Sequence, residues 1–97
     1  MSASRNLLQT LVAFDTTSRE SNLQLIEFVR DYLQGFDVPC ELIYNESRSK
    51  ANLFAGIGPD DVPGIVLSGH TDVVPVDGQP WTLPPFALSE RDGKLYG

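Results

Sequence analysis

The chain has 97 residues, enough for one domain that buries about 60–65% of the surface its unfolded form exposes. Apolar residues make up 41% and charged residues 21% of the composition, which is typical of a soluble globular protein and excludes a disordered or fibrous one. Thirteen acidic and seven basic residues give a net charge of -6, so we expect neither nucleic acid nor a membrane surface as a partner.

The sequence shows none of the features that direct a protein into or across a membrane. No window approaches the ~18 consecutive apolar residues of a membrane span. The opening stretch MSASRNLLQTLVAF lacks the basic and continuously apolar regions of a signal peptide.

Cys40 is the single cysteine, which excludes an internal disulfide and a multi-cysteine zinc site. We therefore expect a cytoplasmic protein.

Two amphipathic helices are predicted in the first part of the chain. Apolar residues recur at three- and four-residue steps over 5–14, which predicts the first helix. The same periodicity predicts a second helix over about 21–34, with Gly35 as its stop. This helix begins near either Ser21 or Thr17, because each is followed three residues later by Gln or Glu, as in a capping box.

In the middle of the chain the pattern changes to that of β-strands. Alternating residues over 38–44 predict a half-buried edge strand, and 52–57 is a second strand candidate. The run Ile65-Val66-Leu67 is continuously apolar, which predicts a central strand over 64–69 that is buried on both faces. After a proline-rich loop, an Asp-Gly pair predicts a hairpin turn at 91–94.

These elements indicate an α/β fold in which two helices precede a mixed sheet. A sheet with a central strand usually needs helices on both faces, and both predicted helices come early in the chain. We therefore expect residues 1–97 to be the first part of a larger domain, truncated after Gly97.

One short motif suits metal chemistry. The predicted central strand runs into Ser68-Gly69-His70-Thr71-Asp72, and ligands of open α/β sheets bind beyond the carboxyl ends of the strands. In an extended segment residues i and i+2 point the same way, so His70 and Asp72 would share one cleft. A neutral imidazole is a common zinc ligand, and a nearby carboxylate fixes its tautomer. The spacing therefore favours a metal ligand with an orienting partner, although a single histidine is more often structural.

The stretch SGHTDVVPVDGQPWTLPPFALSERDGKLYG, residues 68–97, resembles the M20 family of metallopeptidases and deacylases. The block GHTDVVP, followed by a Trp, a Pro-Phe pair and DGKLYG, carries the resemblance, which extends back over the predicted helices. Within the family, residues 76–80 resemble the branch that removes the acetyl group from N-acetylornithine in arginine biosynthesis. A succinyl-diaminopimelate desuccinylase or a dipeptidase of the family is the alternative, and a non-catalytic structural fragment is the alternative from another class.

The resemblance implies the N-terminal portion of a zinc-exopeptidase-like catalytic domain that holds two zinc ions, for which cobalt can substitute. It implies that His70 is a metal ligand and that Asp72 is the catalytic aspartate that clamps the imidazole. The implied partner is a small-molecule N-acyl amino acid, and a homodimer is one state it allows for the full-length protein. No residue here matches the family's bridging aspartate, general-base glutamate or remaining ligands, so we expect these 97 residues alone to be inactive.

Overall fold

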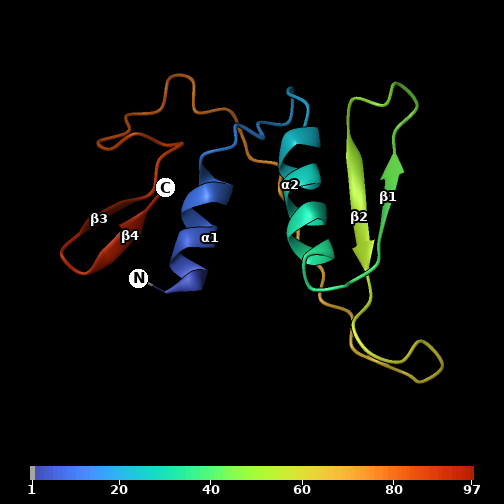
Figure 1. Cartoon of the computed structure of the whole chain (residues 1–97). Helices are drawn as coiled ribbons and strands as arrows, with labels where there is room; N and C mark the ends of the chain where they lie inside the picture. Colours follow the sequence, from blue (N-terminus) through green and yellow to red (C-terminus); the bar gives the residue numbers. More distant parts are fainter. Residues whose placement is uncertain (1) are drawn as a thin grey trace. The chain divides into compact units, whose positions relative to one another are not determined.

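The computed structural model describes residues 2–97, which form two compact units. One unit is made of residues 2–20 and 73–97, and the other of residues 21–72. In chain order the helices and strands are α1 (Ala3–Val12), α2 (Leu23–Gln34), β1 (Cys40–Tyr44), β2 (Ala51–Ala55), β3 (Ser89–Arg91) and β4 (Lys94–Tyr96) (Figure 1). Neither helix within residues 2–97 has the length and apolarity needed to cross a bilayer.

The unit of residues 21–72 is built from α2 and the hairpin of β1 and β2. The two strands pair antiparallel with Leu42 opposite Leu53, and α2 lies beside them (Figure 1). More exposed and less exposed residues alternate along both strands, as expected for a sheet with one covered face. Leu25 and Ile26 of α2 and Ala51 of β2 are buried, so the core of this unit lies between the helix and the hairpin.

The start of α2 differs from both capping boxes that the sequence suggested. Asn22 is the N-cap residue, and its side chain makes no capping hydrogen bond. Its Nδ2 instead donates to the backbone oxygen of Ala51 (2.9 Å), and its Oδ1 accepts from the Ala51 amide (3.0 Å). The side chain that could have capped the helix therefore ties the start of α2 to β2.

The unit of residues 2–20 and 73–97 contains α1 and the hairpin of β3 and β4. Ser2 caps α1 by accepting a hydrogen bond from the Arg5 amide (3.1 Å), which is why the helix begins two residues earlier than predicted. The hairpin turns at Asp92 and Gly93, both at positive φ, as the Asp-Gly pair predicted. A side chain at Gly97 would place its Cβ 2.8 Å from a Val12 methyl carbon, so glycine permits this close approach.

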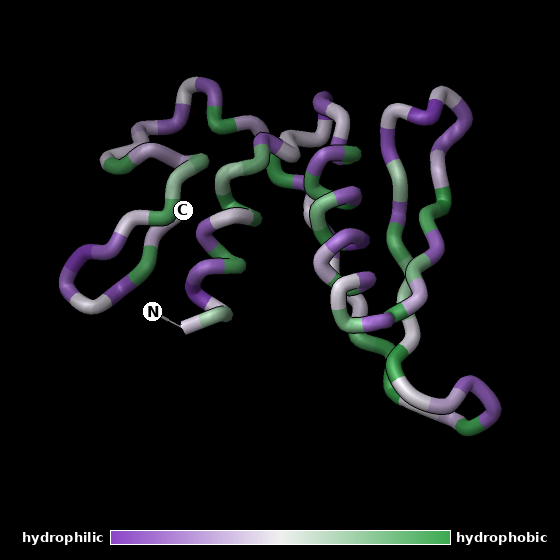
Figure 2. The backbone as a smooth tube through the Cα atoms, in the orientation of Figure 1, coloured by the Kyte–Doolittle hydropathy of each residue, from purple (hydrophilic) through white to green (hydrophobic). Residues whose placement is uncertain are grey.

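The predicted mixed sheet is wrong for the residues that the structure describes. Both sheets are two-stranded and antiparallel, and residues 64–69 form no strand. Ile65, Val66 and Leu67 are 90%, 79% and 93% exposed instead of buried. Figure 2 shows this hydrophobic stretch directly after a loop with a hydrophilic tip. A strand needs neighbours that accept and donate backbone hydrogen bonds, and within residues 2–97 β1 and β2 pair only with each other.

Candidate functional site

His70 and Asp72 lie together on an extended stretch of chain without regular secondary structure. The imidazole Nδ1 is 2.9 Å from Asp72 Oδ1 and 3.1 Å from the backbone oxygen of the same residue. The predicted position at the end of a strand is wrong, because that strand is not formed. The predicted proximity of the two side chains is confirmed, since the i and i+2 positions of an extended segment face the same side.

The hydrogen bond between His70 and Asp72 selects one tautomer of the imidazole. An ionised carboxylate and a carbonyl oxygen can only accept, so Nδ1 carries the proton in this contact. In the neutral ring, Nε2 then keeps its lone pair and can bind a metal ion. Both side chains are largely exposed, 84% for His70 and 58% for Asp72, so the imidazole is accessible in this chain.

The donor set within residues 2–97 fits one ligand of a zinc site and not a complete site. No group of three or more His, Cys, Asp or Glu side chains that could hold a metal ion lies in this part of the chain. A catalytic zinc ion usually takes three protein ligands and an open position. His70 with its carboxylate partner has the chemistry of one such ligand, because a hydrogen-bonded carboxylate orients a ligating imidazole.

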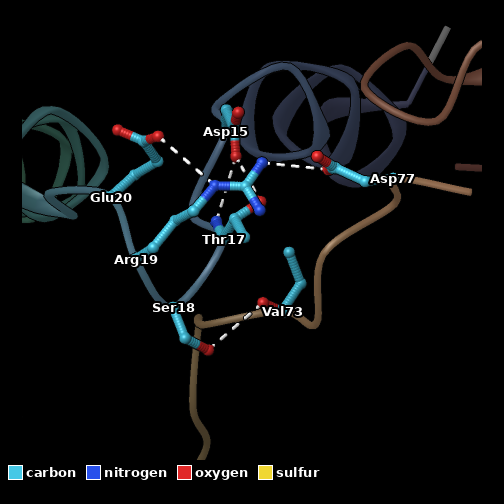
Figure 3. A network of polar contacts seen from close by, with 7 residues as sticks. All are labelled: Asp15, Thr17, Ser18, Arg19, Glu20, Val73 and Asp77. Carbon is cyan, nitrogen blue, oxygen red and sulfur yellow. Dashed lines mark hydrogen bonds and ion pairs between the residues drawn. The ribbon is translucent and has the colours of Figure 1, made fainter.

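A second feature was not anticipated from the sequence: a polar network that joins residues 15–20 to residues 73–77 (Figure 3). Thr17 and Val73 form an isolated parallel bridge, in which the Ser18 amide donates to Val73 O (3.0 Å) and the Val73 amide donates to Thr16 O (3.1 Å). Arg19 Nη2 donates to Asp77 Oδ1 at 2.9 Å. The sequence pattern of the first segment indicates only a possible helix cap at Thr17, because nothing local in the sequence indicates a partner so far along the chain.

Three charged residues of this network, Asp15, Arg19 and Asp77, have shifted pKa values. Hydrogen bonds from the side chain and the backbone of Thr17 hold the pKa of Asp15 below its ordinary value. The hydrogen bond and the positive charge of Arg19 lower the pKa of Asp77 in the same way, and Asp77 in turn raises the pKa of Arg19. At neutral pH all three groups are therefore ionised.

The proline-rich loop ends in a shallow hollow of about 260 Å³ lined by Gln79, Pro80, Trp81, Thr82, Leu83 and Tyr96. Gln79 holds its shape: its Nε2 donates to Pro75 O (2.7 Å), and its Oε1 accepts from Trp81 Nε1 (3.0 Å). Trp81 is 44% exposed, so its ring is only partly covered by the loop. His70 and Asp72 are not among the residues that line this hollow.

Residues 66–97 match the family model of peptidase family M20/M25/M40. An acetylornithine deacetylase of Proteus mirabilis (strain HI4320) is 40% identical over 97 residues, which cover 96% of this chain and 24% of that relative. An acetylornithine deacetylase of Shigella sonnei (strain Ss046) is 44% identical over 80 residues, 80% of this chain and 20% of the relative. A probable succinyl-diaminopimelate desuccinylase of Staphylococcus epidermidis (strain ATCC 12228 / FDA PCI 1200) is 40% identical over 83 residues, 84% of this chain and 20% of the relative.

These matches confirm the resemblance to the M20 family that the residues from Ser68 to Gly97 indicated. The chain spans about a quarter or less of the length of these relatives, 24% and 20% in the two deacetylases. No solved structure matches the chain. The relatives divide between two acyl substrates at similar identity, so the matches agree on the family more than on the substrate.

Proposed function

We propose, on the premise of this resemblance to peptidase family M20/M25/M40, that the chain is the N-terminal portion of a metal-dependent amidohydrolase. The observation that carries the proposal is the contact between His70 Nδ1 and Asp72 Oδ1, which prepares the other ring nitrogen for a metal ion. It lies within the stretch that matches the family model.

The residues of this chain would supply one metal ligand and the carboxylate that orients it. The other ligands and the general base would come from other parts of a longer protein. His70 would donate its Nε2 lone pair to a zinc ion, or to cobalt in its place. Asp72 would accept the Nδ1 proton, fix the plane of the ring and raise the basicity of the ligating nitrogen. When bound, the metal would polarise an amide carbonyl and lower the pKa of a water molecule.

We propose N-acetylornithine as the substrate, which would make the reaction a deacetylation in arginine biosynthesis. The support is the acetylornithine deacetylases that are 40% and 44% identical to this chain. A succinyl-diaminopimelate desuccinylase is the second candidate, because a relative with that name is 40% identical over 84% of the chain. Acetate release and succinate release by the purified full-length protein would separate the two, and the faster reaction identifies the substrate.

Two variants of the full-length protein test the assignment of His70 and Asp72. His70→Ala removes a ligand, so both the bound metal and the hydrolysis rate should fall sharply. Asp72→Asn keeps the ligand but removes the charge that orients it, so we expect most of the metal to remain while turnover falls about 10–100-fold. Metal content is measured by elemental analysis and turnover with the faster substrate.

Asp61→Asn is the matched control, because Asp61 is also an exposed carboxylate and lies in the polar loop that precedes the motif. This variant should match the wild-type protein in metal content and rate. Near-normal rates and metal content in both His70→Ala and Asp72→Asn would contradict the proposal.

A further inference from the structure

The segment that follows Asp72 is held at two points. At its beginning, both the amide and the carbonyl of Val73 are hydrogen-bonded to the backbone of residues 16–18. At its end, the Asp77 carboxylate accepts a hydrogen bond from Arg19. Val73 is bonded directly to Asp72, so anything that fixes the backbone of Val73 also limits the torsions through which Asp72 can turn.

The first of these points is shielded from water on the side of Thr16 and Thr17, whereas Val73 is 42% exposed. Thr16 and Thr17 are 6% and 1% exposed, which makes Thr17 the most deeply buried side chain that the structure describes. Its hydroxyl donates to Asp15 Oδ1 at 2.6 Å, and its amide donates to the same oxygen at 3.0 Å. The backbone that binds Val73 is therefore itself held rigidly by a satisfied buried hydroxyl.

The second point, the ion pair of Arg19 and Asp77, is exposed to water. The Arg19 and Asp77 side chains are 52% and 68% exposed, and an exposed ion pair contributes little to the stability of a fold. The ion pair nevertheless restricts where the two segments can lie, because it joins residues that are 58 positions apart in the sequence. Arg19 also lies 3.7 Å from Glu20, and this second carboxylate keeps the guanidinium near the loop.

We propose that Arg19 and Asp77 are positioning residues: their ion pair keeps residues 73–77 on the loop of residues 15–19, so that the Asp72 carboxylate stays on His70 Nδ1. The inference rests on the proposed function, because it assigns Arg19 and Asp77 a part in orienting the same imidazole. Neither residue touches the reacting atoms in this assignment, and each acts only through the backbone of Val73.

Hydrogen exchange of the full-length protein tests whether the ion pair holds the segment. Arg19→Gln and Asp77→Asn should each speed amide exchange in a peptide covering residues 73–77 by about two- to fivefold, the range expected for an exposed ion pair. The double variant should exchange no faster than either single variant, since both remove the same contact. Arg30→Gln is the matched control, because Arg30 and Asp31 form another exposed ion pair at 3.0 Å within α2; it should leave this peptide unchanged.

Steady-state kinetics of the same variants test whether the positioning serves the reaction. We expect kcat to fall about two- to fivefold with KM unchanged, the double variant to equal the single ones, and Arg19→Lys to recover most of the rate. Unchanged exchange, additive effects or a normal kcat in an otherwise active protein would overturn the inference alone. A wild-type protein that hydrolyses neither N-acyl amino acid would overturn the proposed function and the positioning role together.

Discussion

Thr17 shows how a single polar side chain can organise a loop. It is 1% exposed, yet its hydroxyl and amide both donate to Asp15 Oδ1, so burial leaves no polar atom of this side chain unsatisfied. The neighbouring residue Ser18 can then present its amide to Val73. Hydrogen bonds therefore connect this loop both to itself and to Val73.

Replacing Thr17 with valine keeps the shape of the side chain and removes its hydroxyl. We expect Thr17→Val to lower the free energy of unfolding by about 1–2 kcal/mol, because the hydrogen bond from the buried Thr17 hydroxyl to Asp15 Oδ1 is lost. Urea denaturation of the chain measures the change. Thr17→Ser keeps the hydroxyl and should lose less.

Thr10→Val is the control for this substitution. The Thr10 hydroxyl donates to Asn6 O at 3.1 Å on the exposed surface of α1, so its removal should change the free energy of unfolding by no more than about 0.5 kcal/mol. Equal effects at positions 10 and 17 would show that the contact with Asp15 contributes nothing special.

Acid should weaken the same loop. The pKa values of Asp15 and Asp77 are lowered in the folded chain, so these carboxylates bind protons more weakly there than in the unfolded chain. Their contribution to stability is present above the ordinary aspartate pKa of about 4 and is lost as the pH falls through it toward the lowered values. The midpoint of thermal unfolding should therefore decline on acidification, and less steeply in Asp15→Asn. Identical slopes in the two proteins would refute this cause.

The start of α2 is joined to β2 by the side chain of Asn22. Asn22 both donates to and accepts from the backbone of Ala51, which is 4% exposed. Asn22→Ala should lower the free energy of unfolding by about 1–3 kcal/mol, because a buried amide and a buried carbonyl lose their partner. Chemical denaturation measures this change in the free energy of unfolding. Asn52→Ala is the control, because Asn52 is exposed on β2 and its replacement should have little effect.

The sequence pattern predicts the elements that depend on neighbouring residues. It does not predict correctly the strand that would depend on partners far away in the sequence. Periodicity placed α1 and α2 within a few residues, and the Asp-Gly pair placed the turn between β3 and β4. The run Ile65-Val66-Leu67 carries an equally clear apolar signal, but that signal states only that the residues suit burial. It does not supply the neighbouring strands that a central strand requires.

The candidate site likewise combines a contact between near neighbours in the sequence with a contact between distant residues. The contact of His70 with Asp72 follows from their i and i+2 spacing and was predicted from the sequence. The contact of Arg19 with Asp77 was not predicted, because 58 positions separate the two residues. A single exposed charge does not indicate which opposite charge it will pair with. The family resemblance did not supply it either, since it assigned a role only to His70 and Asp72.

The 97-residue chain should bind zinc far more weakly than the full-length protein and should not hydrolyse N-acetylornithine. The reason is the number of ligands, because no group of three or more metal-binding side chains lies within residues 2–97. Calorimetric titration with zinc and an assay of acetate release measure both properties. Stoichiometric binding as tight as that of the full-length protein would show that the centre of the site lies elsewhere in these residues.

The bridge between Thr17 and Val73 also has a consequence for the order of folding during synthesis. The unit that contains it is discontinuous, since residues 2–20 must wait for residues 73–97, whereas the unit of residues 21–72 is continuous. On the ribosome, the helix and hairpin of the continuous unit can pack as soon as they have emerged from the exit tunnel. Residues 2–20 remain without their partners in residues 73–97 while more than fifty further residues are made, and closing so long a loop is slow. Helix α1 is thus made before the continuous unit and completed after it.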